Sequence, residues 1–163
     1  MSLDKIHLPG FLWASLFKDT IVDTNPPVDH PVQKTTIDFL GGNQKHVLFV
    51  TSHTGHKFIP DDQLHFLNNL LAACGLTMAD IALINVASQS SSYLEVKKQL
   101  HPKVVLLMGV TAPEMALPFA IPLFQVQRFQ DQRYLICPSM QDLQHDKELK
   151  KQLWACLKKV FDL

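Results

Sequence analysis

Short apolar runs alternate with amphipathic stretches along this chain from Lys45 onward. Each run is bounded by polar or turn-forming residues, and the runs predict strands at 46–52, 81–87, 103–109 and 133–139. A fifth strand is predicted at 121–126, joined to the last one by the polar stretch 127–132. The runs are continuously apolar, which is typical of strands covered on both faces.

Helix signals fill the spaces between these runs. Apolar residues recur at helical spacing after residue 60, with Asp61 or Asp62 as the expected N-cap and Gly75 at the expected end. Ser92 and Glu95 have the spacing of a capping box.

Two further helices are predicted in the second half of the chain. Residues 111–117 predict a short helix that ends before Pro118. Asp146 is the expected cap of a long amphipathic helix, in which Leu149, Leu153 and Leu157 share one stripe.

Strands that alternate with helices in this order predict an α/β fold: a three-layer α/β/α sandwich around a mostly parallel sheet of four or five strands. The most apolar strand, 103–109, is expected in the interior of the sheet. Residues 1–44 are interpreted as an apolar N-terminal segment with a linker, and residues 45–163 as the α/β domain. Ligands of such sheets bind at the carboxyl ends of the strands, which directs attention to the loops that follow them.

Composition narrows the class of protein. The chain has 163 residues, of which 47% are hydrophobic and 18% charged, as expected of one globular domain. Fifteen basic and fifteen acidic residues balance, so DNA binding is possible but is not supported by net charge. No membrane partner is expected, because no apolar run approaches the ~20 residues that span a bilayer. The start shows no secretory leader, so a cytoplasmic location is expected.

The loops after the strands hold few groups that suggest chemistry. His53 and His56 could hold a metal or act as a base, but without a third ligand a solvated loop is the better interpretation, and no metal or cofactor is expected. Cys137 and Ser139 lack a nearby base, and Cys137 ends an apolar strand, where a small core residue is more usual. Gly109 could allow close approach of a ligand or only a tight turn.

The N-terminal segment carries a dense set of large apolar side chains. It could pack on the domain or supply anchors to a partner, because aromatic residues dominate binding hot spots. The candidates for partner binding are Leu8, Phe11, Leu12, Trp13, Leu16 and Phe17.

The order of motifs resembles the uracil-DNA glycosylase superfamily over roughly residues 45 to 161. "VVLLMGVTAPEMAL" is similar to that family's strand and Gly-x-x-Ala helix start, which matches Gly109 and Ala112. "CPSMQDL" falls where the family has its His-Pro-Ser motif, which matches Pro138 and Ser139. The resemblance implies a pocket lined by Ser52, His53, Gly109, Ala112, Cys137, Pro138 and Ser139.

Two departures from the family concern its catalytic groups. The family's first strand ends in a loop with a polar Asp or Asn that places the hydrolytic water, and here the loop "TSHTGHKFIP" has neither. Cys137 stands where the family's histidine stabilises the departing uracil anion, and a thiol is a far weaker hydrogen-bond donor.

Within this superfamily the chain looks most similar to the psi subunits of bacterial DNA polymerase III, which are non-catalytic. "CPSMQDLQHDKELKKQLW" resembles their Pro-x-Leu-x-x-Leu turn and "LW" helix, and "LPGFLW" resembles their clamp-loader-binding segment more loosely. The resemblance implies a clamp-loader-type protein partner in DNA replication. The alternative is an active DNA base-excision enzyme, in which His53 or His56 would activate water and Ser139 would contact the substrate.

Overall fold

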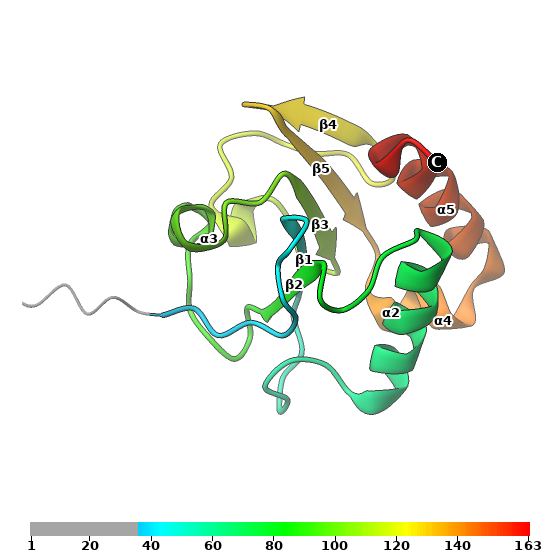
Figure 1. Ribbon diagram of the computed structural model, residues 1–163, viewed down its shortest axis with the longest axis horizontal. Coiled ribbons are helices and arrows are strands. Elements are labelled where there is room, and N and C mark those ends of the chain that lie inside the picture. Colours follow the sequence, from blue (N-terminus) through cyan, green and yellow to red (C-terminus); the bar gives the residue numbers. More distant parts are fainter. Residues whose placement is uncertain (1–35) are drawn as a thin grey trace, which may run out of the picture. The chain divides into compact units, whose positions relative to one another are not determined.

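The computed structural model describes residues 36–163, which form a five-stranded sheet flanked by helices (Figure 1). The strands are β1 (Val47–Thr51), β2 (Ile81–Asn85), β3 (Val104–Met108), β4 (Val126–Phe129) and β5 (Gln132–Cys137). The helices are α2 (Asp61–Ala73), α3 (Tyr93–Leu100), α4 (Met140–His145) and α5 (Lys147–Phe161), with a 3-10 turn, η1 (Pro113–Met115).

The strands follow the order β2-β1-β3-β5-β4. β1, β2, β3 and β5 are parallel, and only β4 runs antiparallel, beside β5. β3 is the central strand, with two strands on each side. The predicted mostly parallel sheet with 103–109 in its interior is therefore confirmed.

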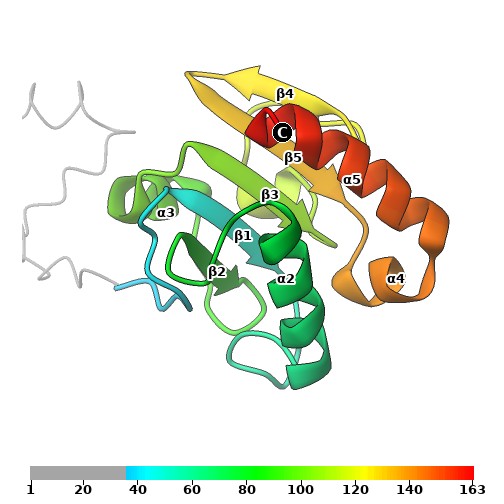
Figure 2. The same cartoon turned by 45° about the vertical axis from the view of Figure 1, so that its right-hand side comes forward.

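Alternating side chains of the strands feed two separate apolar cores, one on each face of the sheet. Phe49 and Leu106 point to the face covered by α2, α4 and α5. Leu48 and Leu107 point to the face covered by α3 and η1. Helices cover both faces of the sheet (Figure 2), and the strand side chains on both faces are buried, which explains why the strands are continuously apolar.

Several predicted helix ends are confirmed. Gly75 has a left-handed φ of +67° after α2, and the next residue, Leu76, donates its N–H to the Leu71 carbonyl at 2.8 Å. Asp146 caps α5 by accepting from the backbone of Glu148 at 2.8 Å. The Ser92 N–H donates to the Glu95 carboxylate at 2.8 Å, as expected of the capping box.

The structure differs from the sequence analysis at three places. Pro60, not Asp61 or Asp62, occupies the N-cap of α2, and both aspartates lie in its first turn. The strand predicted at 121–126 lies instead at Val126–Phe129, so it shares only Val126 with the prediction and continues into the stretch 127–132 that was expected to join two strands. The segment after Ser139 forms the short helix α4, for which the sequence predicted no separate element.

The described part of the predicted linker lies along the sheet. Leu40 pairs antiparallel with Leu83 of β2, with backbone hydrogen bonds of 2.9 and 2.8 Å. Ile37 is buried in the core that contains α3. Residues 36–43 therefore cover the outer side of β2.

Candidate functional site

The carboxyl ends of the four parallel strands lie in a row, which we call the carboxyl edge. Thr51 of β1 is in register with Asn85 of β2 and with Met108 of β3, and Met108 is in register with Cys137 of β5. The loops that the sequence singled out after β1, β3 and β5 therefore leave the sheet at the same edge, as in any parallel sheet.

Gly109 and Ser139 touch at this edge. The Gly109 N–H donates to the Cys137 carbonyl at 3.0 Å, and the glycine has a φ of +68°. A Cβ atom at Gly109 would lie 3.0 Å from the Ser139 Cβ, which is closer than side chains normally approach. Gly109 is therefore needed for close packing of the β3 end against the start of α4.

Ser139 holds the first turn of α4. Its hydroxyl oxygen accepts from the Asp142 N–H at 3.2 Å, and its hydroxyl donates to the Asp142 carboxylate at 2.7 Å. These bonds satisfy a helix N-terminus that would otherwise lack partners. The hydroxyl is thus engaged within its own helix.

Cys137 is a core residue with 1% of its surface exposed. Its thiol lies 3.5 Å from the Leu107 carbonyl and donates to it. Burial, and secondarily the nearby Cys156, raise the pKa of Cys137 to about 12. The sulfur is therefore a neutral thiol near pH 7 and supplies neither a nucleophile nor a strong donor for an anion.

Asn85 is a polar residue of this edge that the sequence analysis did not single out. It is fully buried at the end of β2, and its carboxamide oxygen accepts from the N–H groups of His53 at 2.9 Å and Ala87 at 3.1 Å. Its amide nitrogen donates to the carbonyls of His53 and His56, both at 2.8 Å. The one signal in the sequence was a lone asparagine that ends an otherwise apolar strand.

All four hydrogen bonds of this carboxamide go to backbone groups, so Asn85 is a structural clamp on the loop after β1. The clamp places His53 half-buried and leaves Ser52 and His56 exposed. Burial is the main cause that lowers the pKa of His53, the charge of His56 lowers it further, and Asp62 opposes both. The His53 imidazole is consequently neutral near pH 7.

The remaining predicted site residues either display no free functional groups at the carboxyl edge or lie outside the described residues. Ala112 is buried in the core with α3, so its side chain is not displayed at the surface, and Pro138 is half-buried. Within residues 36–163, no cluster of three or more His, Cys, Asp or Glu side chains is arranged to hold a metal ion. The predicted partner-binding residues between Leu8 and Phe17 lie outside the described residues.

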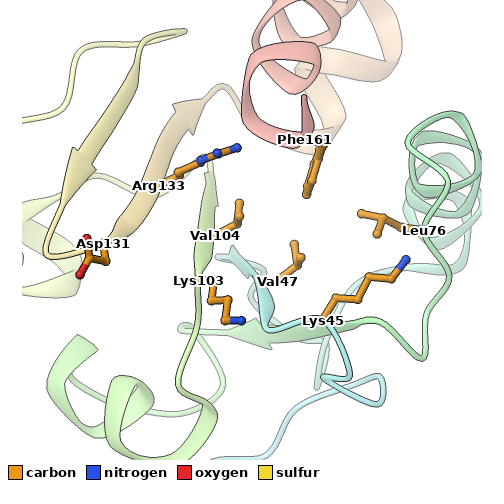
Figure 3. A pocket seen from close by; sticks show the side chains of 8 residues that line it. All are labelled: Lys45, Val47, Leu76, Lys103, Val104, Asp131, Arg133 and Phe161. Carbon is orange, nitrogen blue, oxygen red and sulfur yellow. The ribbon is translucent and has the colours of Figure 1, made fainter. Parts of the chain in front are cut away.

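A hollow of about 390 Å³ opens at the opposite, amino-terminal edge of the sheet (Figure 3). Its walls include Val47, Val104 and Phe161, and cationic side chains stand around them. Arg133 is paired with Asp162 at 2.9 Å, and the exposed amine of Lys45 lies 3.5 Å from the Asp80 carboxylate. These neighbouring carboxylates offset the cations, so the hollow is not a strong anion site.

No helix in the described part of the chain is long and apolar enough to cross a membrane. A scan against protein-family models found no family that matches this chain, and a search of curated proteins found no similar sequence.

Proposed function

We propose that this chain is a non-catalytic protein of the glycosylase type that acts as an interaction subunit in DNA replication, similar to a psi subunit and associated with a clamp loader. One observation carries the proposal. The polar groups at the carboxyl edge are engaged in holding the fold, so few are free to act on a substrate.

The glycosylase-like form of the fold is supported by the arrangement of this edge. The resemblance aligns a glycine turn and a Pro-Ser motif with separate strands, and in this chain Gly109 and Ser139 lie in contact. The loops after β1, β3 and β5 share one edge of a mostly parallel sheet. We therefore propose the α/β/α sandwich of that superfamily for this chain.

The absence of catalysis is supported by the state of individual groups. Base excision needs a group that places water and a donor that stabilises the departing base anion. Asn85 carries a carboxamide at the carboxyl edge, but all four of its hydrogen bonds are made to backbone groups. Cys137 is buried and protonated where the family has histidine.

A diverged DNA N-glycosylase remains the second candidate, because His53 meets one requirement of a general base. Its pKa is lowered, so the imidazole is free to accept a proton near pH 7. Its backbone is held in place by Asn85, and it lies on the loop after β1, where the family has its water-placing residue.

Release of uracil separates the two candidates. We expect the purified protein to release no uracil above background from single-stranded or duplex DNA that contains uracil, measured by mass spectrometry of the free base. Release that is lost in both His53→Ala and His56→Ala would establish the second candidate instead.

Association with a clamp loader tests the first candidate directly. We expect the full chain to co-elute with reconstituted clamp-loader subunits of the same organism in size-exclusion chromatography. The double substitution of Phe11→Ala with Trp13→Ala is expected to abolish co-elution. Ser139→Ala at the carboxyl edge is the matched control and is expected to leave it intact. Failure of the unsubstituted chain to co-elute would refute the clamp-loader role.

A further inference from the structure

The two edges of the sheet differ in how their backbone groups are used. On the β2 side, residues 40–43 cover the edge: Leu40 exchanges two hydrogen bonds with Leu83, and the Asn43 N–H donates to the Ile81 carbonyl at 2.8 Å. β4 forms the opposite edge, and β5 is its one strand neighbour (Figure 1). One edge is therefore covered by the chain's own residues, and the other is open along β4.

The pairing of the hairpin shows which groups of β4 are free. Gln130 and Asp131 both have left-handed φ values, of 49° and 62°, which make the two-residue turn of a hairpin closed by a hydrogen-bonded pair, Phe129 and Gln132. Hydrogen-bonded pairs alternate along an antiparallel ladder. In agreement, the Arg133 N–H donates to the carbonyl of Lys103, on the β3 side of β5. Arg133 is therefore not hydrogen-bonded to Arg128, its partner in the register of β4 and β5.

It follows that the N–H and C=O groups of Val126 and Arg128 point away from β5. No other described residue pairs with these outward groups. A row of free donors and acceptors on an edge strand is the template for an added strand.

An apolar hollow lies directly beside this strand. It measures about 230 Å³ and lies between α3, the loop after η1 and the β4–β5 hairpin. Its lining includes Leu94, which is 66% exposed, and Phe129, which is 38% exposed. The ring centroids of Phe129 and Phe119 lie 4.6 Å apart with the rings tilted by 40°, and Phe119 meets Tyr134 edge-on at 5.1 Å. A strand added next to β4 would pass this hollow and could place a large side chain in it.

Two cationic side chains near β4, Arg128 and Lys97, have no ion-pair partner among the described residues. Arg128 is exposed, and the Lys97 amine donates to the Gln130 side-chain carbonyl at 2.8 Å. Asp131, in the turn, is the one acidic residue of the hairpin. The open edge thus favours a partner that carries carboxylates.

We propose that β4 and the adjoining hollow bind an extended, acidic segment of a partner protein as a sixth strand. Main-chain hydrogen bonds to Val126 and Arg128 supply affinity, a carboxylate pairs with Arg128, and a large apolar side chain occupies the hollow of Leu94 and Phe129. A second copy of this chain fits less well. Antiparallel pairing of two β4 strands would set their Arg128 side chains opposite or diagonal to each other, about 5–8 Å apart.

This inference does not rest on the proposed function, whose partner-binding residues are expected in the N-terminal segment. Random peptides displayed on phage serve as the probe and are selected on the immobilised full-length protein. The enriched peptide is then synthesised with a fluorescent label, and its dissociation constant is measured by anisotropy. We expect enriched sequences that combine acidic residues with a large apolar residue.

Three substitutions test the mode of binding. Arg128→Glu reverses the charge, Arg128→Pro removes the outward N–H at a position where an edge strand tolerates proline, and Leu94→Asp places a charge in the hollow. Each is expected to weaken peptide binding about tenfold or more. Lys147→Glu, on the exposed first turn of α5, is the matched charge-reversal control and is expected to leave binding within about twofold. Trp13→Ala is likewise expected to have no effect, which separates this surface from the N-terminal one.

Amide signals of Val126 and Arg128 are expected to shift in NMR spectra when the peptide binds. Thermal melting shows whether the Arg128→Pro variant folds. If this variant does not fold, peptide binding by Arg128→Glu and Leu94→Asp tests the proposal. The proposal is overturned if no peptide is enriched, or if neither of these two substitutions changes the dissociation constant of the enriched peptide. It is also overturned if the protein is a dimer that Arg128→Pro or Leu94→Asp dissociates, because β4 would then bind a second copy.

Discussion

At the scale of single residues, Asn85 shows how one buried carboxamide fixes a loop. We predict that Asn85→Ala lowers the free energy of unfolding by about 2–3 kcal/mol, because buried backbone partners in the loop after β1 lose their hydrogen bonds. Urea denaturation measures the loss. Asn69→Ala, at an exposed position of α2, is the control and is expected to change stability by less than about 0.5 kcal/mol. Equal effects of the two substitutions would show that the clamp contributes no stability.

Cys137 gives a prediction on pH. Burial raises the pKa of its thiol to about 12 in the folded protein, from an ordinary value of 9.0. The folded state therefore holds this proton more tightly than the unfolded state does. The resulting stabilisation is fully present below about pH 9 and is lost as the pH rises toward about 12.

We predict that stability falls less steeply in Cys137→Ala when the pH is raised. Between about pH 8 and pH 10.5, urea denaturation is expected to show a decrease that is about 1–2 kcal/mol smaller in this variant than in the unsubstituted protein. Burial also raises the pKa values of Cys74, Tyr93 and Tyr134, but these contribute to both proteins alike. Parallel curves for the two proteins would contradict the assignment to Cys137.

At the scale of elements, the contact between β3 and α4 depends on a glycine. Gly109→Ala is predicted to lower the free energy of unfolding by about 2 kcal/mol. The added methyl group strains the left-handed backbone and is also forced against Ser139. Gly75→Ala is a matched control, since Gly75 has nearly the same φ but nothing within 4 Å of an added Cβ. In urea denaturation, we expect this control to lower the free energy of unfolding by about 1 kcal/mol, because only the backbone is strained. Equal costs would show that the ends of β3 and α4 adapt to the added methyl group.

One strand was predicted at the wrong residues and one helix was not predicted, each for a definite reason. β4 is an edge strand with polar side chains, so its apolar periodicity is weak, and the strand was assigned to the more apolar run just before it, 121–126. α4 has only six residues, too few to show a helical repeat. Its real signal was local: Ser139 at the cap and Asp142 three positions later, the spacing of a capping pair.

At the scale of the whole molecule, the described residues already supply both cores and all five strands of the sheet. We therefore predict that deletion of residues 1–20 leaves the melting temperature within about 3 °C, while binding to a clamp loader is lost. Differential scanning calorimetry and size-exclusion chromatography measure the two quantities. A large drop in melting temperature would mean that the apolar residues between Leu8 and Phe17 stabilise the domain itself.

The sequence by itself determined the class of fold. Runs such as 46–52 and 103–109 are short, continuously apolar and bounded by turn signals, as is typical of strands buried on both faces. The caps at Ser92, Gly75 and Asp146 depend on interactions within a few residues. These features are local, so they can be read along the chain. The identity of a partner stays a prediction, because the residues expected to bind it lie outside the described part.

Only the tertiary structure decided what the polar residues at the carboxyl edge do. Asn85 clamps a loop more than 25 residues away in the chain, and Gly109 meets a serine 30 residues further on. The open edge of β4 likewise follows from strand order, which no local pattern reveals. Hydrogen bonds and contacts between distant segments depend on how the chain is folded back on itself, and that arrangement engages the Asn85 carboxamide in holding the loop after β1.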